Sequence, residues 1–363
     1  MSCVIVGAGI AGTTLALKLL AKKRPFTLIN QTENFHLNFA SVRAIAVPGW
    51  AEKSLIPLTT FGDSFKKGKV VKILPGEADG KVVLASGDEV DYQYLVLATG
   101  TTHKWPVKLI GMEKEEAFNG YKDLVERVKN AKKVVVVGGG ATGVETVAEI
   151  KTVYPDKEVT LIHATDHLVT DKLTERSQQK LQDIMKNEFK ANLLLGEKVE
   201  NLNDLSETGP GTVVTNKGTS IEADVLFKFV GLKVNNDAYK DSLSSAVDEK
   251  GALKVDNCLR VEGFKNIYAI GDCTNIDEPK LAMYAIKQGE TMATSILNMD
   301  KGKPEATYKP DSAPILTAFS LGPNNGFART KGDWKMPVFL VKKIKSTNLF
   351  TDKWWKDLNQ ECP

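Results

Sequence analysis

Two glycine-rich turns, each directly after an apolar run, most constrain what this chain can fold into. The first is Val4-Ile5-Val6-Gly7-Ala8-Gly9-Ile10-Ala11-Gly12. It predicts a buried parallel strand, a tight turn and a helix. Gly7 would make the turn, Gly9 would let a pyrophosphate approach the backbone, and Gly12 would let the helix pack closely on the strand. The free N–H groups and the positive dipole end of that helix would then face the phosphates.

The same pattern recurs at residues 134–143. Four valines lead into a turn in which Gly138, Gly140 and Gly143 take the three glycine positions. A single glycine-rich turn can also bind nothing, so one copy alone says little about a ligand. Two copies in one chain predict two dinucleotides, with a hydride path from one to the other.

A dinucleotide fold expects an acidic residue at the end of the strand after each glycine unit, where it accepts hydrogen bonds from the adenosine ribose. The first unit has the uncharged acceptor Asn30 there, with Glu33 close enough to substitute. The second unit has His163. Because no carboxylate stands there to repel a 2′-phosphate, His163 predicts use of both NADH and NADPH. The alternative is a histidine that only ends a strand.

Length and composition limit the classes of function. A chain of 363 residues, 42% hydrophobic and 26% charged, is long enough for two or three domains with full cores. A net charge of +3 gives no reason to expect a nucleic-acid partner. The four cysteines are scattered and the four histidines lack ligand spacing, so we expect neither a redox disulfide nor a metal site. Oligomeric state does not follow from these features.

The sequence also bears on location. No apolar run approaches the length of a membrane-spanning helix, and the N-terminus begins almost directly in a predicted strand, without signal-peptide features. We therefore expect an intracellular, cytoplasmic protein. Residue two is Ser2, whereas N-myristoylation needs glycine there, so that lipid anchor is not expected.

Periodicity and turn residues predict the other main elements. Helices are expected to start near Tyr121, Gly143 and Lys280, and a hairpin is expected from Leu316 across residues 322–326. Further strands are predicted at residues 26–30, 69–73, 81–85, 94–100, 158–163 and 267–272.

Four signals stand in a fixed order, namely the first glycine unit, Ala98-Thr99-Gly100, the second glycine unit and Gly271-Asp272. This order, over nearly the whole chain, resembles the flavoprotein oxidoreductases with two dinucleotide-binding domains. Within that family, Phe35-His36-Leu37-Asn38, residues 157–163 and Lys345-Ser346 are most similar to the apoptosis-inducing-factor homologues. The resemblance implies an α/β fold in which an NAD(P)H-binding domain is inserted into an FAD-binding domain.

On this resemblance we expect two Rossmann-like domains and a C-terminal α+β segment. The FAD-binding domain would comprise residues 1–104 and 256–310. The NAD(P)H-binding domain would comprise residues 105–255, and residues 311–363 would form an interface segment on the quinone side.

The resemblance also implies roles on FAD. Residues 7–12 would cradle its pyrophosphate, and Arg43 would lie near the phosphates unless it is only a surface charge. The backbone of Val71 would meet the adenine, and Gly100 belongs to the same FAD-binding set. Asp272 would accept a hydrogen bond from the ribityl chain.

Further roles lie near the nicotinamide and the flavin ring. The helix from Lys280 would aim its N-terminus at the flavin pyrimidine edge and stabilise negative charge there. Gly138, Gly140 and Gly143 would hold NAD(P)H. Glu145 would be catalytic by orienting the nicotinamide carboxamide; the alternative is a carboxylate favoured only by the helix dipole.

The implied activity is that of an NAD(P)H-dependent FAD oxidoreductase acting on lipid-soluble quinones of the ubiquinone or vitamin K type. An antioxidant, ferroptosis-suppressing role goes with this resemblance. One alternative is a reductase of a small iron–sulfur or haem protein. Another is a cell-death signalling protein whose bound nucleotides set its conformation.

The C-terminal part predicts contact with a membrane. Residues 301–345 hold nine lysines and arginines against three acidic residues. Trp334 and residues 338–341 lie among them, Ile344 follows, and Trp354 and Trp355 stand further on. Because aromatics mixed with lysines suit the interfacial zone, we expect weak peripheral contact with cytosolic membranes or lipid droplets. The alternative is a solvated basic face.

Overall fold

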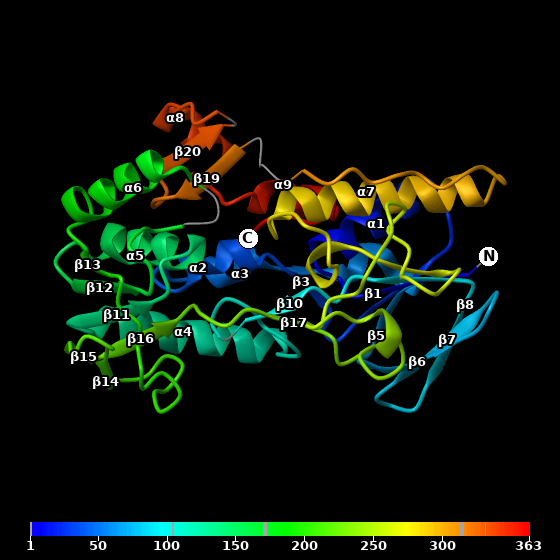
Figure 1. The fold of residues 1–363 in the computed structure, drawn as a ribbon, viewed down its shortest axis with the longest axis horizontal. Helices are drawn as coiled ribbons and strands as arrows, with labels where there is room; N and C mark the ends of the chain where they lie inside the picture. Colours follow the sequence, from blue (N-terminus) through cyan, green and yellow to red (C-terminus); the bar gives the residue numbers. More distant parts are fainter. Residues whose placement is uncertain (1, 104, 170–172, 312–315, 331) are drawn as a thin grey trace.

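Two parallel β-sheets organise the fold, one around each glycine unit (Figure 1). The structure is a computed structural model that describes residues 2–103, 105–169, 173–311, 316–330 and 332–363. Both predicted strand–turn–helix units are confirmed, and with them the α/β fold with two Rossmann-like sheets.

The first sheet has five strands in the order β18-β9-β1-β2-β5, and all its pairs are parallel. Its helices α1 (Ile10–Ala21) and α7 (Ala282–Met299) pack on each other where Gly289 lies over the backbone of Ala11. The strands are β1 (Cys3–Val6), β2 (Thr27–Asn30), β5 (Phe65–Lys67), β9 (Tyr94–Leu97) and β18 (Ile267–Ala269).

Both faces of this sheet are covered, which explains why β1 is apolar along its whole length. Because side chains of a strand alternate between faces, Cys3 and Ile5 join the core that contains α1 and α7. Val4 and Val6 join the core under the antiparallel sheet β6-β7-β8.

The second sheet has the order β13-β12-β11-β16 and is also parallel. Val134 and Val136 of its central strand share a core with the neighbouring helices, and Val135 and Val137 share one with the β14–β15 hairpin. The strands are β11 (Lys133–Val137), β12 (Glu158–His163), β13 (Asn192–Leu195) and β16 (Val225–Lys228), and the helices are α4 (Lys114–Asn130), α5 (Ala141–Val153) and α6 (Glu175–Asn187).

The remaining elements are short. The antiparallel strands are β3 (Asn34–His36), β4 (Leu55–Pro57), β6 (Val70–Pro75), β7 (Gly80–Leu84), β8 (Glu89–Tyr92), β10 (Thr101–Thr102), β14 (Gly211–Val214), β15 (Ser220–Ala223) and β17 (Lys233–Val234). The helical turns are α2 (Ser41–Ala44), α3 (Trp50–Ser54) and 3₁₀ turns at Asn38–Ala40, Leu58–Ser64, Ser244–Ala246 and Gly271–Cys273.

The chain passes between the two sheets at the antiparallel pair β10–β17. Beyond β17, Tyr239, Leu243 and Leu253 are buried in the core of the first sheet. Residues 236–255, which the sequence assigned to the NAD(P)H-binding domain, therefore pack on the FAD side. Their apolar side chains fill the space beside β6–β8, a contact that sequence spacing does not reveal.

The C-terminal segment touches both halves of the molecule (Figure 1). Its predicted hairpin is present as β19 (Leu316–Ser320) and β20 (Gly326–Thr330), and Phe319 and Phe327 are buried in the core of the second sheet. A helical stretch follows as α8 (Val338–Val341), a π-helical turn (Lys342–Ser346) and α9 (Thr351–Asp357). Trp354 of α9 packs against Phe35 in the hydrophobic core between the first sheet and its helices, with ring centroids 4.8 Å apart.

Two predicted helix starts were wrong. α4 begins at Lys114 rather than near Tyr121, because Glu115 and Glu116 suit the positive end of a helix in its first turn. α7 begins at Ala282 rather than at Lys280, after an extended Leu281. Within the described residues, no helix is long and apolar enough to cross a membrane.

Candidate active site

The first glycine turn has the three properties that a pyrophosphate cradle needs. Gly7 has φ +106°, and a Cβ there would lie 2.5 Å from the carbonyl oxygen of Ala98. A Cβ on Gly12 would lie 1.9 Å from the carbonyl oxygen of Gly7, so only glycine lets α1 approach this closely. A Cβ on Gly9 would meet nothing within 4 Å, which leaves open space beside the helix N-terminus.

The second turn repeats this geometry. Gly138 has φ +113° and would place a Cβ 2.5 Å from the carbonyl oxygen of Phe229. A Cβ on Gly143 would clash with Gly138 at 1.9 Å, and one on Gly140 would meet nothing within 4 Å. The two turns therefore offer the same open, phosphate-sized approach to the backbone.

Among the five described helices that are longer than ten residues, three begin without neutralisation of their positive ends. α1, α5 and α7 have neither a side-chain cap nor an acidic residue in the first turn. By contrast, α4 has acidic residues there, and α6 has the Thr174 cap and Glu175. Because an uncapped N-terminus presents free N–H groups, these three ends suit the two pyrophosphates and the flavin ring.

The residues at the ribose positions bind their own glycine turns. Asn30 Oδ1 accepts a hydrogen bond from Ala8 N at 3.0 Å, and His163 Nδ1 accepts one from Gly139 N at 3.0 Å. Each side chain thus orients the middle residue of a turn. The substitute acceptor Glu33 is exposed at the surface. The ribose contacts of Asn30 and His163 stay predictions.

His163 is held in its neutral form. Burial lowers its pKa below the usual value, and Nδ1 acts as the hydrogen-bond acceptor, so the remaining proton lies on Nε2. A neutral ring neither repels nor attracts the 2′-phosphate of NADPH strongly.

Asp272 lies beside the first glycine unit. Gly271 has φ +78°, and a Cβ there would lie 3.1 Å from Cβ of Ala11. Asp272 Oδ2 accepts a hydrogen bond from Thr101 Oγ1 at 2.9 Å. Lys108 Nζ donates to that same hydroxyl oxygen at 2.6 Å, and burial lowers the pKa of Lys108 while Asp272 opposes the shift. The fold thus brings the predicted ribityl acceptor to the phosphate cradle and orients it.

The other FAD-side residues are placed as follows. Gly100 ends the loop after β9 with φ +66°, and its carbonyl oxygen accepts from Asn235 N at 3.0 Å. Val71 lies at the irregular register of β6, 44% exposed. Lys280 precedes α7 and donates to the Thr274 carbonyl oxygen at 2.8 Å. Contacts of these three residues with FAD stay predictions.

Glu145 is buried and meets the C-terminal segment. Its Oε1 accepts hydrogen bonds from Lys345 Nζ at 2.7 Å and from Ser320 N at 2.8 Å. Lys345 also donates to the Ala318 carbonyl oxygen at 2.8 Å. The role of Glu145 at the nicotinamide stays a prediction.

Arg43 is not a surface charge, because its side chain is only 1% exposed. Its Nη2 lies 2.8 Å from Glu149 Oε1, one turn beyond Glu145 on α5. Glu149 is fully buried, and burial raises its pKa while Arg43 opposes that shift. The predicted contact between Arg43 and the FAD phosphates stays a prediction.

Sequence reasoning missed Lys345, Glu149 and Lys108 as site residues. Lys345 lies 200 residues from Glu145 along the chain, and no spacing connects them. Glu149 offered a signal, since a glutamate four residues after Glu145 shares its helix face. Lys108 had none, because it stands in a loop of irregular composition.

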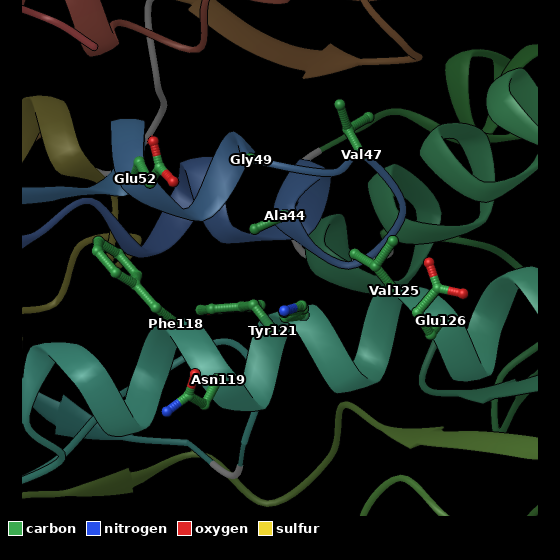
Figure 2. Close-up of a pocket in the computed structure, with 10 residues that line it drawn as sticks. Ala44, Val47, Gly49, Glu52, Phe118, Asn119, Tyr121, Val125 and Glu126 are labelled. Atoms are coloured by element: carbon green, nitrogen blue, oxygen red, sulfur yellow. The ribbon is translucent and has the colours of Figure 1, made fainter.

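A small pocket, partly open to solvent, lies between α2–α3 and α4 (Figure 2). Its volume of about 210 Å³ is below that of ordinary small-molecule sites. Phe118 and Val125 point into it from α4, and Glu52 and Glu126 lie near its two ends. It contains none of the predicted cofactor residues.

Comparison with known proteins identifies the class. Residues 1–289 match the family model of pyridine nucleotide-disulphide oxidoreductases. The chain therefore belongs to this family, whose members combine FAD with NAD(P)H. The four cysteines Cys3, Cys258, Cys273 and Cys362 are free thiols, so no disulfide accompanies the dinucleotide sites.

Several relatives match nearly the whole chain, and two of them are described here. "Ferroptosis suppressor protein 1" of Taeniopygia guttata is 39% identical over 99% of this chain and 96% of its own length. "Apoptosis-inducing factor homolog A" of Dictyostelium discoideum is 32% identical over 99% of this chain and 92% of its own length. The chain is thus similar to the apoptosis-inducing-factor homologues, and it is an NAD(P)H-dependent flavoprotein oxidoreductase.

Solved structures share the fold. The sulfide:quinone oxidoreductase of Aquifex aeolicus aligns with a TM-score of 0.75 at 19% identity, over 99% of this chain and 91% of its own. A water-forming NADH oxidase from Lactobacillus brevis, bound to NADH, aligns with a TM-score of 0.68 at 20% identity, over 91% and 75%. At these identities the likeness concerns the fold alone.

The purified protein is expected to be yellow, with bound FAD. Asp272→Asn should weaken FAD retention by about 1–3 kcal/mol, because a charge-assisted hydrogen bond is lost. Flavin fluorescence released on dilution measures the dissociation constant, and the exposed Asp277→Asn is the matched control. Equal retention in both variants would show that Asp272 does not contact the cofactor.

Steady-state rates with NADH and NADPH are expected to lie within about two orders of magnitude, since no carboxylate rejects the 2′-phosphate. Because His163 stays neutral, their ratio should change little between about pH 8 and about pH 6.5. A ratio that shifts toward NADPH as the pH falls would show that His163 becomes a cation at the phosphate.

Proposed function

We propose that this chain is an NAD(P)H:quinone oxidoreductase that reduces a lipid-soluble quinone of the ubiquinone or vitamin K type. An antioxidant, ferroptosis-suppressing role would follow from that activity. The observation that carries the proposal is the contact between Lys345 and Glu145, because it connects the C-terminal segment to the predicted hydride-transfer site. The printed name of the full-length relative, "Ferroptosis suppressor protein 1", supports the ferroptosis-suppressing role.

The residues suit the needs of this reaction. FAD, when bound, accepts a hydride from NAD(P)H and returns two electrons to a second acceptor. Reduction of a quinone to a hydroquinone takes up two electrons and two protons. NAD(P)H supplies both electrons and one proton in the form of a hydride, and the second proton comes from solution or from a protein donor. Glu145 would orient the nicotinamide, and Lys345 Nζ brings a proton donor within 2.7 Å of that carboxylate.

The C-terminal segment also offers an apolar surface. Phe339 is 69% exposed and Trp334 is 77% exposed, and Val338, Leu340 and Ile344 of the same segment are partly exposed. We call these five side chains the apolar rim. A long quinone tail needs such a surface to leave the lipid, whereas a small redox protein would need a charged platform.

We propose further that the apolar rim makes weak, reversible contact with a membrane surface. Lys335, Lys342 and Lys343 lie close to it in the sequence and would meet anionic lipid headgroups at about 1 kcal/mol each. Lys345 does not belong to this basic set, because Glu145 holds it. Lys331, counted among the nine basic residues of the sequence, lies outside the described residues.

Trp354 and Trp355 are not part of this surface, so the sequence-based expectation was wrong for them. Trp354 is 4% exposed and Trp355 is 7% exposed. The Trp355 indole N–H donates to the Lys53 carbonyl oxygen at 2.9 Å, which fixes α9 on the first half of the molecule. Their apolar surface is buried in the core and is therefore not available for contact with a membrane.

Lys345→Met is expected to lower the NADH:quinone rate by about 100-fold or more, because a proton donor and the partner of Glu145 are lost together. FAD content should stay unchanged. The rate is measured with a short-tailed ubiquinone in detergent-free buffer, and Lys343→Met, exposed two residues earlier, is the control. If both variants retain the full rate, the Lys345–Glu145 contact serves packing alone.

Co-sedimentation with liposomes should rise with anionic lipid and fall with salt. Phe339→Ser and the triple change of Lys335, Lys342 and Lys343 to Gln should each reduce it several-fold. Leu74→Ser, which removes an exposed apolar side chain on β6 outside the rim, is the control. Absence of binding to anionic liposomes at low salt would exclude this mode of contact.

A further inference from the structure

A single guanidinium, that of Arg43, joins three segments far apart in the sequence. From α2, Nε and Nη2 donate to the carboxylate of Glu149 on α5, with distances of 2.8–3.0 Å. Nη2 also donates to the Ser346 carbonyl oxygen at 2.7 Å, and Nη1 donates to the Thr347 carbonyl oxygen at 2.9 Å. The Trp50 ring lies 4.6 Å below the guanidinium carbon and fixes its plane.

Glu149 and Glu145 lie one turn apart on α5, so the two carboxylates face the same neighbours. Ser320 is shared between them, since its backbone N donates to Glu145 at 2.8 Å and its hydroxyl lies 3.5 Å from Glu149 Oε1. Arg43 and Lys345 therefore balance two buried carboxylates. None of the four side chains is more than 16% exposed.

This arrangement leaves Arg43 poorly placed to serve a phosphate. Most of its donors are used by protein acceptors, and turning away would leave Glu149 as an unpaired carboxylate with 0% exposure. A buried charge stripped of its partner is strongly unfavourable, so the guanidinium stays on α5.

We propose that Arg43 and Glu149 form a positioning pair for hydride transfer. They fix α5, whose N-terminus holds NAD(P)H, against α2 on the FAD side. They also fix the Ser346–Thr347 turn, which sets Lys345 on Glu145. The pair thus acts through Glu145 rather than on the cofactor, and the proposal is independent of which acceptor takes the electrons afterwards.

The test compares Arg43→Gln, Glu149→Gln and their double variant. Arg24→Gln is the matched control, because Arg24 forms another largely buried pair, with Asp300, far from α5. Three quantities are measured, namely the FAD content, the limiting rate of flavin reduction by NADH in anaerobic stopped flow, and the NADH dissociation constant from the same traces. Arg43→Lys keeps the positive charge but lacks the planar guanidinium that binds a carboxylate through two hydrogen bonds. This variant replaces Arg43→Gln in the comparison if Arg43→Gln does not fold.

All variants are expected to retain FAD. Both single changes should slow the limiting rate by about 10- to 100-fold, as expected for a small displacement of the reacting groups. The NADH dissociation constant should change by only about 3-fold, and the double variant should be no slower than the slower single one. Arg24→Gln should keep the rate.

Two results would overturn the proposal. Loss of FAD in the Arg43 variants but not in Glu149→Gln would show that Arg43 binds the FAD phosphates. An unchanged limiting rate in Glu149→Gln and in the Arg43 variants would show that the pair only stabilises the fold.

Discussion

The structure depends first on a contact that only glycine permits. Within each unit, the third glycine of the turn lies so close to the first that an added Cβ would approach a carbonyl oxygen to 1.9 Å. This approach lets α1 and α5 start directly at the carboxyl ends of the central strands β1 and β11. As a result, the N-termini of α1 and α5 are uncapped and carry a partial positive charge, which suits the phosphates of two dinucleotides.

Ion pairs between buried side chains then connect the FAD-binding and the NAD(P)H-binding parts of the molecule. The turns alone would give two separate binding units, but hydride transfer needs one dinucleotide held against the other. The cluster of Arg43, Glu149, Glu145 and Lys345 supplies charges from the FAD side, from the NAD(P)H side and from the C-terminal segment. Because the four side chains are buried, removal of any one of them would leave a buried charge without its partner. The cluster therefore favours one arrangement of the FAD side, the NAD(P)H side and the C-terminal segment.

The sequence predicted much of the fold because its strongest signals are local. Glycine spacing, apolar runs such as Val134–Val137 and the Gly271-Asp272 strand end each depend on neighbours in the chain. Where local signals weaken, the predictions failed. The start of α4 was hidden in a charged stretch, and Trp354 and Trp355 looked like interface residues because burial depends on a partner surface that spacing does not show.

The sequence predicted which residues belong to the FAD site and which belong to the NAD(P)H site. It did not predict how the two sets of residues lie relative to each other. Glu145 was singled out, but its partner Lys345 lies 200 residues away in the chain. The family resemblance assigned Arg43 to the FAD phosphates. Its buried partner Glu149 lies on α5, which belongs to the NAD(P)H-binding part. Such long-range pairs are fixed by the folded packing, so a single sequence without its structure does not reveal them.

We propose that electrons flow from NAD(P)H through FAD to a quinone, and an anaerobic titration followed by flavin absorbance would measure this flow. NADH should bleach the flavin band of the purified protein. A short-tailed ubiquinone, added in an amount equal to the flavin, should then restore the band fully. A band that NADH bleaches but that the quinone does not restore would contradict the account and would point to a different electron acceptor.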